Sequence, residues 1–149
     1  MRLHYMAIAS VIALSSVAPL AASDCPPAVT AAVQKAHAGA TVASCKQEQE
    51  KGKTQFEVKL AAKDGKKMEI DVSPDGRILM TEETVALSDV PSAVMNAFAA
   101  KYGAAKPTRA ESQTTADGKV SYELAFPVAG KKKMKEATFT SEGSFVEEE

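Results

Sequence analysis

The segment from Asp71 to Glu82 has the residue types and spacing of a cation-binding loop. Asp71, Ser73, Asp75 and Glu82 occupy ligand positions of the loop that binds calcium in EF-hand proteins, and Gly76 occupies its tight turn. Oxygen ligands in this order suit calcium or a similar hard cation. The Ser-Pro-Asp-Gly sequence is equally typical of a hairpin turn between two strands. A cation site and a plain hairpin are therefore both open at this segment.

Catalytic chemistry would have to depend on His37, the one histidine after residue 23. His37 follows Val33 by four residues, at the end of an apolar helical stripe, where an amphipathic side chain at the edge of a core is expected. The chain has no nucleophile elbow, phosphate-binding loop or His-Glu-x-x-His zinc motif. We therefore predict a protein that is not an enzyme, with no catalytic residues and no organic cofactor.

The first 23 residues have the layout of a secretory signal peptide. A short basic start at Arg2 precedes an apolar stretch from Ala7 to Leu20, and small residues follow it up to Ser23. The apolar stretch is shorter than the roughly 20 residues that span a bilayer, and no later stretch is apolar enough to do so. We expect a periplasmic or secreted protein that has no membrane span after cleavage.

Cys25 and Cys45 are the two cysteines of the chain. An even number of cysteines in an oxidising compartment favours a disulfide, so we predict a Cys25–Cys45 bridge. The alternative is a soft-metal site with His37, but the spacing of the three residues matches no familiar zinc pattern.

One sequence pattern occurs twice, in residues 24–83 and again in residues 84–149. Pro26 aligns with Pro91, and the Phe-Glu-Val-Lys-Leu segment at residues 56–60 aligns with Tyr-Glu-Leu-Ala-Phe at residues 122–126. Each copy begins with a proline-led apolar stripe that predicts a helix, at about residues 26–38 and 91–102. Alternating segments that predict strands follow it. We predict an α+β fold of two tandem modules, each with one helix packed on a three- to four-stranded antiparallel sheet.

The proline-led helix, the Tyr/Phe-Glu-Val/Leu strand and the Asp-Gly hairpin resemble the PepSY-like family of small exported bacterial proteins. The resemblance covers the chain after residue 23, twice, and its motifs specify a fold rather than a site. It implies a module related to the fold of β-lactamase inhibitor protein, with helices covering one face of an antiparallel sheet. The family is associated with binding or restraining peptidases and other exported proteins. It implies no catalytic residues.

Charge and patterning favour a protein partner. Cleavage of the signal peptide removes one charged residue, Arg2, and leaves 17 basic and 19 acidic side chains, a balance that does not suggest nucleic acid. We predict a non-enzymatic binding module for an exported protein or peptide, with inhibition of a peptidase as one form of it. The alternative is a small calcium-type protein that uses the Asp71–Glu82 loop. The residues predicted to contact a partner, from the polar sheet faces, are Glu57, Lys59, Glu69, Glu123 and Lys135.

Overall fold

The computed structural model describes residues 25–63, 66–130 and 132–149, so the predicted signal peptide lies outside the described residues. Its elements follow one another as two helices, each succeeded by four strands, with a short 3₁₀ turn before the second helix. The elements are α1 (Pro27–Ala36), β1 (Val42–Glu50), β2 (Lys53–Lys63), β3 (Lys66–Val72), β4 (Ile78–Val85), η2 (Leu87–Asp89), α2 (Ser92–Tyr102), β5 (Arg109–Thr115), β6 (Val120–Phe126), β7 (Lys135–Thr140) and β8 (Phe145–Glu148).

All eight strands form one antiparallel sheet, in the order of the sequence from β1 to β8. The prediction of two tandem modules, each with one helix packed on a three- to four-stranded antiparallel sheet, is therefore wrong. β4 pairs with β5 from Met80 opposite Thr115 to Val85 opposite Ala110, because each strand would otherwise expose an unpaired edge. The predicted module boundary at residues 83–84 falls inside β4. The fold is β-rich, with two short helices of 10 and 11 residues.

The helices pack against one face of the sheet, and alternation of side chains along the strands explains which face. Val29 and Val33 on α1 are fully buried, as the apolar stripe predicts, and pack with Ile70 and Val72 of β3. A strand points successive side chains to opposite faces. The intervening Asp71 therefore points away from α1.

The second helix buries a more aromatic core. The ring of Phe98 on α2 lies 5.0 Å from that of Phe126 and 6.4 Å from that of Phe139, both at steep angles. Tyr102 continues the cluster, with its ring 4.6 Å from that of Phe126. Such edge-to-face pairs add about 0.5–1.5 kcal/mol beyond the burial of their area.

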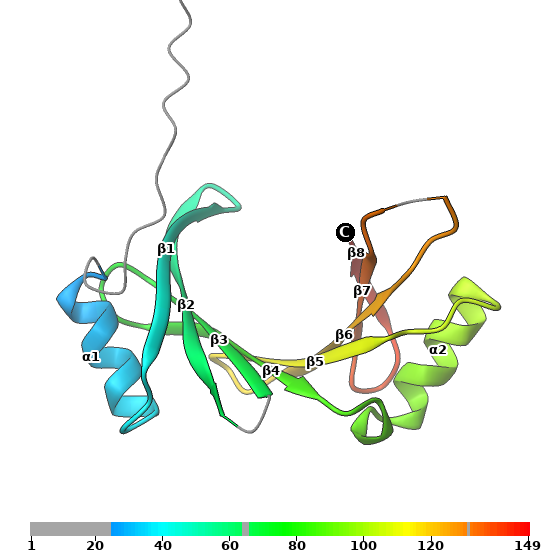
Figure 1. Ribbon diagram of the computed structural model, residues 1–149, viewed down its shortest axis with the longest axis horizontal. Helices are drawn as coiled ribbons and strands as arrows, with labels where there is room; N and C mark the ends of the chain where they lie inside the picture. The colour runs from blue at the N-terminus through cyan, green and yellow to red at the C-terminus, as the bar shows by residue number, and fades with distance from the viewer. Residues whose placement is uncertain (1–24, 64–65, 131) are drawn as a thin grey trace, which may run out of the picture.

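The sheet is bent into an open arch, and both helices lie on its outer side (Figure 1). Register shifts interrupt the pairing of several strands, including one between Asp71 and Val72 and one between Thr138 and Phe139. Such bulges bend a strand and increase its twist. Because both helices lie on the outer side, the inner face of the arch carries no helix among the described residues. The strands present their polar side chains on this inner face.

The predicted disulfide is confirmed: Cys25 is bonded to Cys45, with Cα atoms 5.6 Å apart. Cys25 precedes α1 by two residues, and Cys45 lies fully buried in β1. The bond therefore ties the start of the first helix to the edge strand of the sheet.

Candidate binding groove

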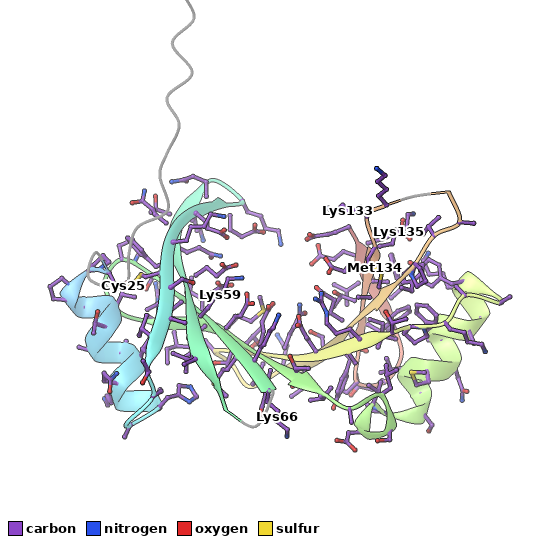
Figure 2. The ribbon with its side chains drawn as sticks, viewed as in Figure 1. Cys25, Lys59, Lys66, Lys133, Met134 and Lys135 are labelled. Atoms are coloured by element: carbon purple, nitrogen blue, oxygen red, sulfur yellow. A yellow bond between two sulfur atoms is a disulfide. The ribbon has the colours of Figure 1, made fainter. Side chains whose placement is uncertain are left out.

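The inner face of the arch forms an open groove with a volume of about 690 Å³. Strands β1 to β8 all contribute to its lining, and Lys59 points into it (Figure 2). Eleven carboxylate side chains line the groove, against three cationic ones, Lys51, Lys59 and Arg109. The acidic residues are Glu48, Glu50, Glu57, Glu69, Asp71, Glu82, Glu111, Glu123, Glu136, Glu147 and Glu149.

The register of the sheet places acidic side chains directly opposite one another. Glu57 faces Asp71 across β2 and β3, and Glu69 faces Glu82 across β3 and β4. Glu111 and Glu123 make the same pairing across β5 and β6. Like charges directly opposite in a sheet are destabilising. The groove therefore holds a charge arrangement that the fold alone does not favour.

Cations within the groove compensate only part of this charge. The Lys59 ammonium lies 3.2 Å from a Glu57 oxygen and 3.0 Å from a Glu69 oxygen. Arg109 contacts Glu136 at 2.6 Å and lies 3.6 Å from Glu111.

Three further carboxylates on the central strands form a set that we call the acidic strip. It consists of Asp71 on β3, Glu82 on β4 and Glu123 on β6. Within the part of the chain that the structure describes, none of the three makes a salt bridge. The strip therefore carries charge that no cation of the groove pairs with directly.

Gln113 on β5 holds two members of the acidic strip together. Its side-chain nitrogen donates hydrogen bonds to Glu82 at 3.1 Å and to Glu123 at 3.3 Å. Its side-chain oxygen accepts a hydrogen bond from the Ser121 hydroxyl at 3.1 Å, which fixes the orientation of the amide. Because Gln113 is only 9% exposed, its donors are directed at the two carboxylates rather than at bulk water.

Burial and mutual repulsion raise the pKa of every member of the acidic strip. Desolvation, followed by the charge of Glu57, raises the pKa of Asp71 to about 6. Desolvation and then the charge of Asp71 raise the pKa of Glu82 to about 7. The pKa of Glu123 is raised to about 7 by desolvation and then by Glu136. Near neutral pH, Glu82 and Glu123 are therefore partly protonated, and a bound cation would displace those protons.

These pKa values predict that the protein loses stability as the pH rises from 5 to 8. In the unfolded chain the carboxyls titrate near pH 4, so between pH 4 and about 7 the folded state binds more protons than the unfolded state. Stability falls with rising pH wherever that holds. Glu82→Gln should therefore raise the free energy of unfolding at pH 8 by about 1 kcal/mol, allowing for solvent screening of a half-buried group. Chemical denaturation at pH 5 and pH 8 measures the effect.

Glu83→Gln is the matched control for this prediction. Glu83 neighbours Glu82 on β4 but lies on the opposite face, across from Met68. We expect it to change the free energy of unfolding by no more than a few tenths of a kcal/mol at either pH, as for an ordinary surface substitution. A Glu82→Gln effect of the same size at pH 5 and pH 8 would contradict the repulsion described above.

The structure divides the predicted cation ligands between two places. Asp71 and Glu82 point into the groove. The Ser73 hydroxyl is engaged in the turn, where it donates to Asp75 and accepts a hydrogen bond from the backbone N–H of Arg77 at 3.0 Å. Among the described residues, no group of three or more His, Cys, Asp or Glu side chains is placed to hold a metal. The calcium-type loop stays a prediction, and it would require these four side chains to rearrange.

Four of the five residues predicted to contact a partner lie together in the groove: Glu57, Lys59, Glu69 and Glu123. Lys135 does not join them. It pairs with Phe126, whose ring is buried beneath α2, and so lies on the helix side of the sheet. There Lys135 contacts Glu148, which accepts a hydrogen bond from the Tyr102 hydroxyl at 2.7 Å.

Sequence reasoning missed Glu111 and Gln113, which lie at the centre of the groove. Both belong to β5, whose sequence Arg-Ala-Glu-Ser-Gln-Thr-Thr is polar at nearly every position. The alternation of apolar and polar residues that predicts a strand is therefore absent there. A weaker signal was available, because Ala110 is the one apolar residue in β5 and it marks the buried face.

Solved structures show the fold that this chain shares with other proteins. A candidate periplasmic protein of Bacteroides eggerthii is 20% identical, with a TM-score of 0.66 over 84% of this chain and 88% of the other. A DUF2874 family protein of Bacteroides uniformis is 17% identical, with a TM-score of 0.66 over 83% and 88%. A BLIP-like protein of Bacteroides fragilis is 19% identical, with a TM-score of 0.57 over 91% and 88%.

These likenesses confirm the part of the sequence resemblance that concerned the fold of β-lactamase inhibitor protein. No protein-family profile matches the chain, so the PepSY-like name itself is not supported. The search of curated proteins found no relative. Among the described residues, neither helix is long and apolar enough to cross a membrane.

Proposed function

We propose that this chain is a non-enzymatic periplasmic binding protein that holds a protein partner in the groove on the inner face of its sheet. The observation that carries the proposal is the difference between the two faces of the sheet. The outer face is covered by α1 and α2 and buries both hydrophobic cores. The inner face keeps an open groove about 690 Å³ in volume, lined by side chains of all eight strands.

Export to the periplasm is supported by three independent features. The first 23 residues have the pattern of a signal peptide. The Cys25–Cys45 disulfide is of a kind that persists in oxidising compartments. The fold is shared with a candidate periplasmic protein of Bacteroides eggerthii. A BLIP-like protein with this fold favours protein binding over catalysis as the general role.

A bulky substitution inside the groove should abolish partner binding. Met80 lines the groove between Asp71 and Thr115, its neighbours across the two adjacent strands. Met80→Trp adds volume there without changing the charge or filling the core. We expect immobilised wild-type protein to retain a defined partner from an extract of exported proteins of the producing cell, and Met80→Trp to retain none of it. Mass spectrometry of the eluates measures the difference.

Ala31→Trp is the matched control, since Ala31 is exposed on α1, on the outer side of the arch. It should retain the same partner as the wild type. Thermal unfolding of both variants shows that each is folded. Equal retention by Met80→Trp and wild type would refute a binding site in the groove.

A further inference from the structure

We infer that the groove takes a basic segment of its protein partner, an extended stretch with lysine or arginine at alternate positions. This inference rests on the proposed function and names the chemistry of the partner. The acidic strip and its acidic neighbours across the strands have no cation of their own to neutralise them fully. Complementary charge both steers a partner to a concave face and sets the preference between partners.

The charge of the protein is concentrated in the groove. The whole sequence has a formal net charge of −1, yet the groove lining has eleven acidic and three basic side chains. Most lysines therefore lie elsewhere on the molecule. An evenly distributed charge would serve solubility, whereas one sign gathered in a hollow focuses its field on a ligand of the other sign.

Buried polar groups in the groove point independently to a ligand. Gln55 is 9% exposed and Thr138 is 5% exposed, and both line the groove. Among the described residues, the buried side-chain group without a hydrogen-bonding partner is the hydroxyl of Thr84, which lies opposite Glu111. The Gln55 amide and the Thr138 hydroxyl line the groove, and we assign them to hydrogen bonds with the partner.

The spacing of the acidic strip fits an extended peptide. Its members lie on β3, β4 and β6 and run diagonally across the sheet. Asp71 and Glu82 are one strand and two residues apart in register, which is about 8 Å, and the Glu82 and Glu123 oxygens that share the Gln113 nitrogen lie close together. Side chains on one face of an extended segment repeat about every 6.8 Å, a spacing similar to both separations. Three basic side chains at alternate positions can therefore each approach one carboxylate of the strip.

A short synthetic peptide tests this inference on the purified protein. The probe is a fluorescent peptide of sequence Lys-Ser-Lys-Ser-Lys, and its control replaces each lysine by glutamine. At pH 8 and low salt, fluorescence anisotropy should show that the lysine peptide binds at least about tenfold more tightly than the glutamine peptide. The double variant Glu82→Gln/Glu123→Gln should lose about tenfold in affinity for the lysine peptide.

Two further variants distinguish specific binding of the lysine peptide in the groove from general electrostatic attraction to the protein. Glu83→Gln/Asp89→Asn removes the same number of charges outside the groove lining and should leave the affinity within about twofold, since rim charges contribute little. Thr138→Val keeps the shape of Thr138 and removes its hydroxyl, and it should weaken the lysine peptide about threefold.

Three results would overturn the inference. One is equal binding of the lysine and glutamine peptides. Another is an equal loss of affinity in the groove and control double variants. The third is spermidine binding as tightly as the lysine peptide, because the groove would then recognise a small cation. In each case, loss of partner capture by Met80→Trp would still support the proposed function, so the two claims fail separately.

Discussion

Replacing Gly143 with alanine is expected to lower the free energy of unfolding by about 3 kcal/mol. Gly143 has a φ of +89°, a conformation that costs other residues about 1–2 kcal/mol. A Cβ atom at this position would also lie 2.6 Å from the backbone oxygen of Ala93 on α2. The turn between β7 and β8 and the first turn of α2 are therefore in direct backbone contact. Urea denaturation of the variant measures the loss.

Gly118 separates the two contributions to this loss. It has a similar φ of +81°, but a Cβ atom there would have no neighbour within 4 Å. Gly118→Ala should therefore cost only about 1 kcal/mol. Gly76→Ala should behave like Gly143→Ala, because its Cβ would lie 2.7 Å from the backbone oxygen of Ala28 on α1. Equal losses for Gly118→Ala and Gly143→Ala would show that the contact between helix and turn is unimportant.

Removing the disulfide is expected to cost about as much. Cys25 and Cys45 are 20 residues apart in sequence, and closing a loop of that length restricts the unfolded chain by about 3 kcal/mol. The double variant Cys25→Ala/Cys45→Ala should lose that amount. Alanine avoids placing an unpaired hydroxyl at the fully buried position of Cys45. Chemical denaturation of oxidised protein, reduced protein and the variant measures the effect.

The loss should be greatest around α1. The bond links the start of that helix to β1, whereas α2 has no cross-link and depends on its aromatic core. Hydrogen exchange of the double variant should therefore show weaker protection of α1 amides than of α2 amides. Reduced wild-type protein should match the variant. A variant as stable as the oxidised wild type would show that the first core is sufficient without the bond.

The sequence predicted the local elements of this fold better than their assembly. Val29 and Val33 are buried on α1 as predicted, because the periodicity of a helix depends only on residues close in sequence. The disulfide was predictable because the chain has only two cysteines to pair. The pairing of β4 with β5, which joins the strands of both copies in one sheet, could not be predicted from the sequence. Most side chains of β5 are polar, so no apolar face predicted a neighbour for it.

The residues of the candidate site were predictable where the alternation of apolar and polar residues indicated the correct face of a strand. Glu57, Lys59 and Glu69 lie in the groove because β2 and β3 alternate cleanly. Lys135 lies outside the groove because it is the first residue of β7 and pairs with Phe126, on the helix side of the sheet. A shift of one residue moves every side chain of a strand to the other face. The cross-strand pairing of acidic residues depends on register, which alternation alone does not specify.

The most direct test of partner binding in the groove is a paired affinity measurement with the purified partner. Met80→Trp and Ala31→Trp introduce the same side chain on the inner and outer sides of the arch, respectively. If binding occurs in the groove, Met80→Trp should weaken the affinity by about 100-fold or more, as for a residue at the centre of an interface, and Ala31→Trp should leave it within about twofold. A large loss in Ala31→Trp, with Met80→Trp unchanged, would contradict the account and place the partner on the helices.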